Sequence, residues 1–258
     1  MRFETFGIVG YGHFGQFLAS SLERQGKVLV YDADDAKLEH TTDGVRPAPL
    51  AEVAAADVVV LAVPFSALAP VLREIRDLLG RATVVMDVVS TKERAGQLLE
   101  EILPADANLL ASHPLFGPPS MARIEPGLRV VVTAERGQEA AAFRKFLEEQ
   151  LGLEVVSLSP EEHDRAMAYM QSLPFFIARA LVSIDVLELK HRDDLAIPSF
   201  EKLAEIAFIE QQHTVDMFDT SQISNSYADE ARRHFLAALQ QLQGEIDEHR
   251  TGKPTPEA

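Results

Sequence analysis

The sequence predicts an α/β protein in which a doubly wound sheet is followed by an all-helical C-terminal domain. Short apolar strand patterns alternate with helical patterns as far as Ser157, and a glycine-rich turn follows the first strand. After Pro160 the strand patterns stop and the rest of the chain has helical periodicity. We therefore expect a sheet domain over residues 1–158, a helical domain over 159–248 and a disordered tail over 249–258.

The composition indicates a soluble protein and excludes several classes of function. The formal net charge of the 258 residues is -16, which disfavours a nucleic-acid partner or an anionic membrane surface. The chain has no cysteine, which rules out disulfides, thiolate zinc sites and a cysteine nucleophile. No apolar run reaches the roughly 20 residues of a membrane span, and no signal-like segment opens the chain. We expect a cytoplasmic protein with no metal site.

A glycine-rich turn connects a strand over residues 5–9 with a helix over 16–25. It reads Gly10-Tyr11-Gly12-His13-Phe14-Gly15. This pattern between a strand and a helix is the Rossmann-type dinucleotide fingerprint: the first glycine permits the tight turn, the second admits the pyrophosphate, and the third lets helix and strand pack closely. The helix N-terminus adds free N–H groups for the phosphates. We expect these six residues to bind the cofactor.

The end of the second strand indicates which cofactor is bound. Residues 28–31 form that strand, and Asp32 follows it. A carboxylate here accepts hydrogen bonds from the adenosine ribose and repels a 2′-phosphate. Residues 33–35 include no lysine or arginine to hold such a phosphate. The sequence therefore predicts NAD rather than NADP, and Asp32 can also cap the next short helix.

Later strand ends contribute further candidates for the same site. Ligands of doubly wound sheets bind at the carboxyl ends of the strands. Val63 and Pro64 lie at one such end, and Ser90 lies at the next. Helices are expected between the strands, including one capped by Ser66 that runs to Leu78. The strands are expected over residues 57–63, 83–89, 108–111, 128–133 and 154–157.

The segment Ser112–Pro118 carries the candidate general base. Its prolines and glycine predict a rigid loop after a strand. The histidine on this loop, His113, follows a complete cofactor fold. A neutral imidazole, whose pKa is ordinarily about 6.5, accepts a proton at cytoplasmic pH. We therefore expect His113 to act as the base in a dehydrogenase.

Three helices are expected in the second half of the chain, over residues 161–189, 199–218 and 227–248. The first is interrupted by Pro174 and is apolar nearly all round, which is typical of a helix buried in a bundle or against another subunit. We expect a homodimer built by this half. Near the start of the first helix, His163 is compatible with capping, with a solvated face or with substrate binding.

Several of these motifs together resemble the prephenate/arogenate dehydrogenase family of tyrosine biosynthesis, over nearly the whole chain. The resemblance implies oxidative decarboxylation of a cyclohexadienol, with hydride transfer to a nicotinamide. It implies that His113 takes the ring-hydroxyl proton and that Ser90 hydrogen-bonds the reacting hydroxyl or orients the histidine. The matching residues are Gly10–Gly15, Asp87–Lys92, Ser112–Pro118, Glu162-His163-Asp164, Gln171 and Asn225–Ala228.

The chain departs from the family pattern at two positions. Phe175 stands where the family usually has a substrate-binding histidine, and Tyr227 stands near the place where one branch has an arginine for the ring carboxylate. By resemblance Gln171, Asn225 and Tyr227 are candidate substrate-binding residues. Arg179 is the nearest candidate for the carboxylate, and a helix-surface arginine is the alternative.

The resemblance implies an NAD-dependent prephenate dehydrogenase that forms 4-hydroxyphenylpyruvate. Arogenate, which would give tyrosine, and an amino-substituted prephenate are alternative substrates. A non-enzymatic NAD-binding regulatory module with a decayed site is a further alternative. An imine or β-hydroxyacid reductase shares this domain plan, but such enzymes usually place a catalytic lysine on the helical domain, and neither Lys190 nor Lys202 matches such a motif.

Overall fold

The computed structural model describes residues 3–118, 123–191 and 193–251. The chain divides into two compact units, which are described separately below. Unit 1 comprises Met1–Asp164 and Thr214–Thr220, and unit 2 comprises Arg165–His213 and Ser221–Ala258. None of the helices in the described ranges has both the length and the apolar character needed to cross a membrane.

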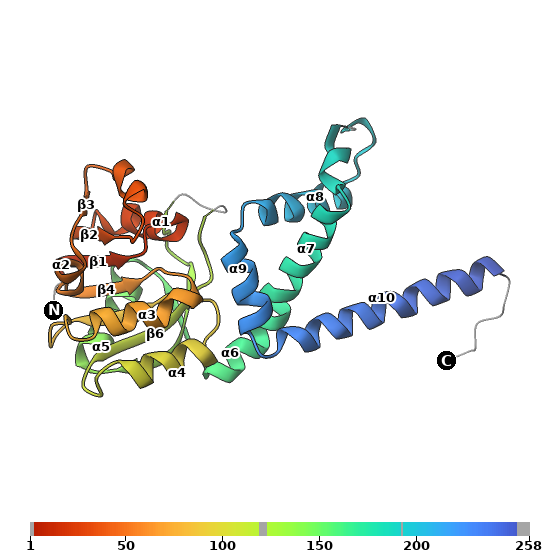
Figure 1. Ribbon diagram of the computed structural model, residues 1–258. Coiled ribbons are helices and arrows are strands. Elements are labelled where there is room, and N and C mark those ends of the chain that lie inside the picture. Colours follow the sequence, from red (N-terminus) through yellow and green to blue (C-terminus); the bar gives the residue numbers. More distant parts are fainter. Residues whose placement is uncertain (1–2, 119–122, 192, 252–258) are drawn as a thin grey trace. The chain divides into compact units, whose positions relative to one another are not determined.

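Unit 1 is built on one eight-stranded sheet with the order β3-β2-β1-β4-β5-β6-β7-β8 (Figure 1). Neighbouring strands are parallel except for β6 and β7, which are antiparallel. The chain reverses its direction of winding at β1, which pairs with β2 on one side and β4 on the other, so the ligand crevice is expected there. The strands are β1 Thr5–Val9, β2 Lys27–Tyr31, β3 Val45–Pro47, β4 Val58–Leu61, β5 Val84–Asp87, β6 Asn108–Pro114, β7 Arg129–Arg136 and β8 Glu154–Ser157.

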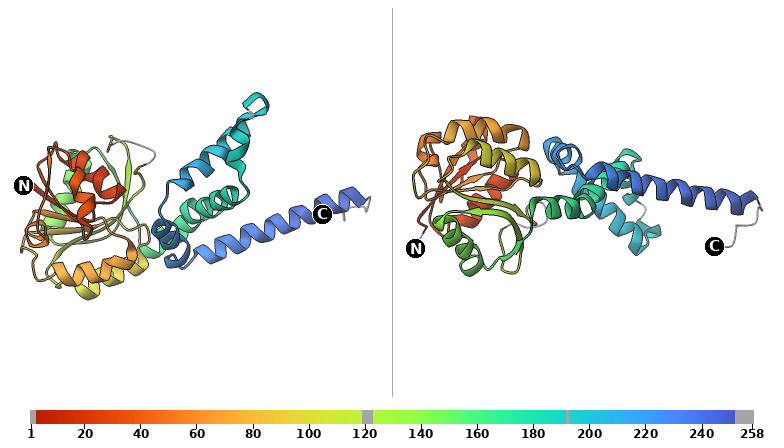
Figure 2. Two further views of the ribbon diagram at one scale, coloured as in Figure 1. Left: turned by 45° about the horizontal axis from the view of Figure 1, so that its top comes forward. Right: turned by 90° about the horizontal axis from the view of Figure 1, so that it is seen from below.

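Helices cover both faces of this sheet (Figure 2), which confirms the doubly wound class. Alternate residues of β4 show the two faces: Val58 and Val60 pack with α1 and α5, whereas Val59 and Leu61 pack with α2, α3 and α4. A 3-10 helix, η1 (Asp35–His40), follows β2. The covering helices are α1 His13–Leu22, α2 Leu50–Ala54, α3 Phe65–Ile75, α4 Glu93–Ile102 and α5 Gln138–Glu149.

Unit 2 is helical, as expected. Its longest helix, α10, has 24 residues, of which only Ala228 and Ala231 are buried. Its large aliphatic side chains, Leu236, Leu239, Leu242 and Ile246, are exposed in a single chain. The elements after β8 are α6 Pro160–Met167, the π-helical segment η2 Ala168–Ser172, α7 Leu173–Ser183, the 3-10 segments η3 Val186–His191 and η4 Asp193–Leu195, α8 Pro198–Gln211, α9 Val215–Asp219, the π-helical segment η5 Thr220–Ser224 and α10 Ala228–Thr251. Of these, α9 and the first residues of α6 belong to unit 1.

Several expected helix boundaries in the C-terminal half were wrong. The helix expected over residues 161–189 is divided by η2, and Pro174 lies in the first turn of α7, where a missing N–H costs no hydrogen bond. The helix expected over 199–218 is broken after α8, because the Thr214 side chain accepts the Met217 N–H and begins α9. Helix α10 continues to Thr251, and the rest of the expected tail lies outside the described residues.

Unit 1 also differs from expectation in detail. The short strand β3 and helix α2 were not expected, because three and five residues give too little periodicity to detect. Helix α3 begins after Pro64 and ends at Ile75, so Ser66 does not cap it and Leu78 lies beyond it. The sheet edge that carries the candidate site is unaffected by these differences.

Candidate active site

The glycine-rich turn after β1 has the geometry of a phosphate-binding loop. Gly10 has a φ of +99°, which favours glycine, and a Cβ on Gly15 would overlap the Gly10 carbonyl oxygen. A Cβ on Gly12 would meet nothing within 4 Å. Gly12 also precedes α1 without a side-chain cap, so the first N–H groups of the helix remain available. The turn therefore has room and donors for a pyrophosphate.

The other residues of the fingerprint differ in their exposure. Tyr11 is buried in the core, Phe14 is half-buried against Phe17, and the His13 side chain is exposed. Val63 lies next to the turn, since a Cβ on Gly10 would also meet its side chain. The backbone of this turn, rather than its buried side chains, is thus what a cofactor can reach.

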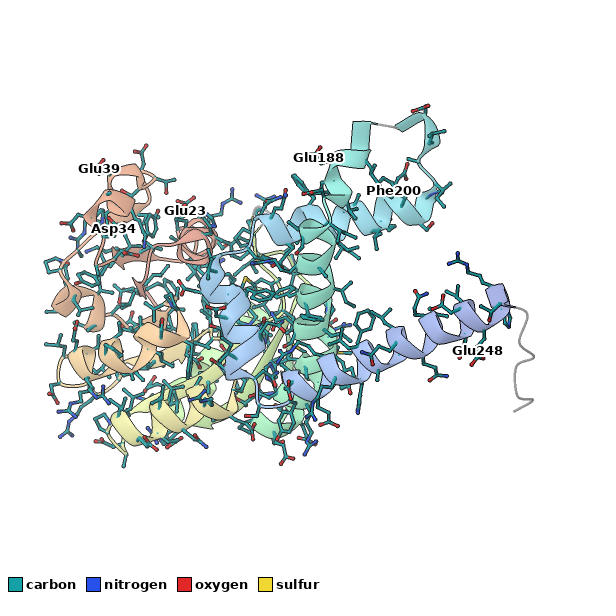
Figure 3. The ribbon with its side chains drawn as sticks, turned by 45° about the vertical axis from the view of Figure 1, so that its right-hand side comes forward. Glu23, Asp34, Glu39, Glu188, Phe200 and Glu248 are labelled. Carbon is teal, nitrogen blue, oxygen red and sulfur yellow. The ribbon has the colours of Figure 1, made fainter. Side chains whose placement is uncertain are left out.

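Asp32 holds the turn in place from the end of β2. Its carboxylate accepts the Tyr11 N–H at 2.7 Å and the Asp34 N–H at 2.9 Å. Burial alone would raise the pKa of Asp32, but these N–H groups and the Lys37 ammonium outweigh it and lower the pKa. Asp34, labelled in Figure 3, caps η1 by accepting the Ala36 N–H, so Asp32 is not that cap.

The absence of a basic neighbour to Asp32, expected from residues 33–35, was wrong. The Lys37 ammonium lies 3.1 Å from the Asp32 carboxylate. The 3-10 turn of η1 brings it back, which could not be read from the three residues after Asp32. Lys37 is half-exposed and pairs with Asp32. Without that carboxylate, its ammonium would be available to another anion.

His113 lies on a strand, so the expected loop at Ser112–Pro118 was partly wrong. β6 extends through Pro114 because its last residues pair with β7, where His113 faces Val131. A bulge between Ala111 and Ser112 shifts the register just before the histidine. His113 is buried at the carboxyl end of β6. The strand therefore fixes the backbone of the candidate base.

A second histidine orients the His113 ring. His113 Nδ1 lies 2.9 Å from His163 Nε2, and His163 Nδ1 lies 2.7 Å from Asp164 Oδ1. His163 is fully buried and therefore has no solvated face. It does not cap α6 either, because Ser159 and Glu162 form the capping box there.

Asp164 and a buried lysine connect this pair to the neighbouring strand ends. The Asp164 carboxylate accepts the N–H groups of Lys92 at 2.8 Å and Glu93 at 3.0 Å, where α4 begins. The Lys92 ammonium contacts the Asp87 carboxylate and the Ser112 carbonyl oxygen, each at 2.5 Å. The segments Asp87–Lys92, Ser112–Pro118 and Glu162-His163-Asp164 thus meet in one buried network.

The surroundings of His113 favour its neutral form. Burial, followed by the nearby His163 and Lys92, lowers the pKa of His113 well below 6.5. Burial also lowers the pKa of Lys92, against the opposing effect of the Asp87 and Asp164 carboxylates. His113 can therefore accept a proton near neutral pH. The half-buried Ser90 makes no hydrogen bond among the described residues, and His163 rather than Ser90 orients the ring.

Of the candidate substrate residues of unit 2, Arg179 lies in a second cluster, with Glu210, His213 and Phe175. The Arg179 guanidinium lies 2.7 Å from the buried Glu210 carboxylate, which also lies 3.0 Å from His213 Nδ1. Arg179 is therefore ion-paired, and its side chain is 39% exposed on α7, which agrees with the helix-surface alternative; its role toward the substrate carboxylate stays a prediction. The His213 ring packs against Phe175, with 4.4 Å between ring centroids.

The remaining candidates of unit 2 lie near η2 and η5. Gln171 is half-buried in η2. Asn225 is buried, and its side-chain oxygen accepts the Tyr227 N–H at 2.9 Å. The Arg165 guanidinium lies over the Tyr227 ring, 4.3 Å from its centroid. Throughout the ranges that the structure describes, no group of three His, Asp or Glu side chains is placed to hold a metal ion.

The network around Asp164 was only partly accessible to sequence reasoning. Asp87 and Lys92 stood out only as parts of matching motifs, and His163 was left with three possible roles. The contact of Asp164 with Lys92 joins residues 72 positions apart and that of His113 with His163 joins residues 50 positions apart, which no local pattern reports. The one available signal was the adjacent pair His163-Asp164, because a carboxylate next to a histidine can fix its tautomer.

Comparison with known proteins identifies similar sequences along most of the chain. The family profile described as prephenate dehydrogenase, nucleotide-binding domain, matches residues 18–164. The profile described as prephenate dehydrogenase, dimerization domain, matches residues 159–253. The chloroplastic arogenate dehydrogenase 2 of Arabidopsis thaliana is 33% identical over 186 residues, which cover 67% of this chain and 52% of the relative. The chain spans about half or less of the length of this and a second plant relative.

Two further similarities extend over more of the chain. The 4-amino-4-deoxyprephenate dehydrogenase of Streptomyces pristinaespiralis is 29% identical over 249 residues, which cover 90% of this chain and 81% of the relative. Among solved structures, prephenate dehydrogenase from A. aeolicus in complex with hydroxyphenyl propionate and NAD+ superposes with a TM-score of 0.77 at 22% identity. That match covers 97% of this chain and 93% of the other and shows a shared fold.

Proposed function

Because the chain belongs to the prephenate dehydrogenase family, we propose that it is an NAD-dependent dehydrogenase that oxidises and decarboxylates prephenate to 4-hydroxyphenylpyruvate. The observation that carries this proposal is His113, a buried and neutral imidazole at the carboxyl edge of the nucleotide-binding sheet. A base of this kind is what oxidation of a ring hydroxyl requires.

The residues present fit a dinucleotide. Gly12 leaves room for the pyrophosphate, and the uncapped N-terminus of α1 offers N–H donors. The ionised Asp32 can accept hydrogen bonds from the ribose hydroxyls. The A. aeolicus structure that shares this fold holds NAD+. When bound, the nicotinamide supplies the hydride acceptor.

The proposed reaction needs one proton acceptor and no metal. The ring hydroxyl gives its proton to His113 while its carbon loses a hydride, so the C–O bond becomes a carbonyl. The ring carboxylate then leaves as carbon dioxide, and the electron pair of the broken C–C bond makes the ring aromatic. His113 returns its proton to the phenolate oxygen. The neutral state of His113 is what permits the first of these steps.

Arogenate and a 4-amino-substituted prephenate are the alternative substrates. They are favoured by the names of the plant and Streptomyces relatives, the second of which matches most of both chains. All three compounds share the cyclohexadiene carboxylate and the decarboxylation step. Comparing kcat/KM for the three compounds, with NAD, identifies the substrate.

We also propose that the chain forms a homodimer through unit 2. The dimerization-domain profile covers residues 159–253, and the large aliphatic side chains of α10 are exposed in a single chain. A second copy of the same helix offers a matching apolar surface.

The test of the proposed function is the substitution His113→Asn. We expect kcat to fall by roughly 10²- to 10⁴-fold with the fold and NAD affinity retained, because asparagine cannot take the proton. Ser90→Ala is the control, and it should cost less because no proton acceptor is removed. The measurements are NAD reduction and NAD titration. Near-normal turnover of His113→Asn contradicts the proposal, and NAD binding without turnover of any substrate indicates a regulatory module.

A further inference from the structure

We propose that His163 and Asp164 are positioning residues that fix the tautomer of His113, so that Nε2 of His113 is the atom that accepts the proton. This inference rests on the proposed function only for the role of His113 as base. The arrangement of the protons follows from the contacts of the free protein. It begins at Asp164, where the direction of hydrogen bonding is unambiguous.

The Asp164 carboxylate can only accept hydrogen bonds. It accepts the Lys92 and Glu93 N–H groups at the start of α4. The His163 Nδ1 atom, 2.7 Å away, must therefore donate its proton to Asp164. In a neutral ring this leaves His163 Nε2 without a proton.

The protonation of His163 in turn determines that of His113. His163 Nε2 is then an acceptor, and the atom 2.9 Å from it is His113 Nδ1. His113 must therefore carry its proton on Nδ1, which leaves the lone pair on Nε2. In the part of the chain that the structure describes, no residue hydrogen-bonds to His113 Nε2, so this atom is available to a substrate hydroxyl.

The pair has a second effect once the proton has moved. Protonated His113 donates from Nδ1 to His163, and this charge-assisted bond is backed by the Asp164 carboxylate. No further proton transfer is needed. Asp87 and Lys92 are the other charged groups packed nearby, and they are paired with each other. Asp164 is thus the acceptor that fixes His163 and, through it, His113.

The direct test is a measurement of the tautomers by NMR in the full-length protein. The eight histidines are labelled with 15N, and two-bond proton–nitrogen correlations distinguish protonated from unprotonated ring nitrogens. His113→Asn and His163→Gln provide the assignments. We expect protonated Nδ1 and unprotonated Nε2 in both rings. Because no substrate is present, the result is independent of whether the proposed reaction occurs.

The opposite arrangement would overturn the inference. If His163 is doubly protonated, or if His113 carries its proton on Nε2, then His163 Nε2 donates to His113 Nδ1 instead of accepting from it. His113 would then present an N–H rather than a lone pair. If the unmodified protein shows the expected tautomers but turns over none of the three candidate substrates, the proposed function is contradicted and the inference about the tautomers still holds.

A matched pair of substitutions tests the effect on catalysis. In His163→Gln the amide oxygen can still accept the His113 Nδ1–H, whereas His163→Leu cannot accept it. We expect His163→Leu to lose at least ~10-fold in kcat with an unchanged KM for NAD, since a wrong tautomer impairs a base even when its geometry is intact. His163→Gln should recover most of that loss. Equal kcat values for the leucine variant and the unmodified protein would contradict the inference.

Asp164→Asn is the second variant, for the case in which His163→Leu does not fold. Its amide oxygen can still accept from His163, so the tautomers should be retained while the negative charge is lost. The acid limb of the kcat/KM profile should then move to lower pH, because protonated His113 loses its stabilising carboxylate. A purely structural role of Asp164 predicts an acid limb at the original pH.

Discussion

At the residue level, the surroundings of His113 determine the pH range in which it can act as a base. The imidazole is buried, and the Lys92 ammonium lies within the same network. Both raise the free energy of the protonated ring more than that of the neutral one. The Asp87 carboxylate lies 2.5 Å from the Lys92 ammonium and holds it in place.

The pH profile should show this effect. Because the pKa of His113 lies well below 6.5, we expect the acid limb of log(kcat/KM) below pH 6.5, with full activity above it. The unfolded chain binds this proton near pH 6.5 and the folded chain only at lower pH, so stability should also fall as the pH drops below about 6.5. Initial rates and thermal unfolding between about pH 4 and 8 measure both. An acid limb above pH 6.5 contradicts this expectation.

Asp32 and Lys37 together should set the choice of cofactor. We expect the unmodified protein to prefer NAD over NADP by at least tenfold, roughly 1.4 kcal/mol. Asp32→Asn should reduce that ratio by at least ~10-fold, because the amide no longer repels a 2′-phosphate and releases Lys37 to meet it. Asp35→Asn is the control: Asp35 is exposed, and its substitution removes one negative charge nearby without affecting the contact between Asp32 and Lys37. Catalytic efficiencies with both cofactors decide, and equal efficiencies in the unmodified protein refute the proposed preference.

At the level of elements, the sequence predicted the parts of the site that depend on one strand end. Gly10, Gly12, Gly15 and Asp32 lie where the strand–turn–helix pattern placed them. The strand position of His113 could not be predicted, because antiparallel pairing with β7 overrides the turn signals of the nearby prolines and glycine. A local sequence pattern predicts a turn or a helix, whereas the extent of a strand depends on the distant strand with which it pairs.

The two glycines at the start of α1 should respond differently to the same substitution. Gly15→Ala should lower the free energy of unfolding by about 1–3 kcal/mol or more, because its methyl group overlaps the backbone of Gly10. Gly12→Ala should leave stability nearly unchanged, since its methyl group enters open space, but weaken NAD binding. Thermal unfolding and NAD titration of both variants make the comparison. A Gly12→Ala variant with unchanged NAD affinity would argue against phosphate binding at this turn.

At the level of the whole molecule, the alternation of strand and helix patterns was sufficient to predict the doubly wound sheet and the helical second half. It could not show which surfaces remain uncovered. The apolar surface for dimer formation was expected on the helix over residues 161–189, but α10 also exposes a row of apolar side chains on one face. This row comprises Leu236, Leu239, Leu242 and Ile246.

This row should be required for dimer formation. Leu239→Glu and Leu242→Glu together should convert a dimer into a monomer near 28.4 kDa, because two charges per chain would be buried without partners. The control is Ala237→Glu, an exposed position on the opposite face of α10. Light scattering at micromolar concentration gives the mass. A monomeric unmodified protein would refute the proposed assembly.

The position of Asp164 has a consequence for recombining domains. Asp164 is the last residue of unit 1 before the chain enters unit 2. A chimaera joined after residue 158 would take both His163 and Asp164 from the donor of the helical part. A junction after Asp164 would instead transfer the base together with the residues that orient it. Because Thr214–Thr220 also belongs to unit 1, an exchange of the helical part would have to keep that segment from the donor of His113, His163 and Asp164.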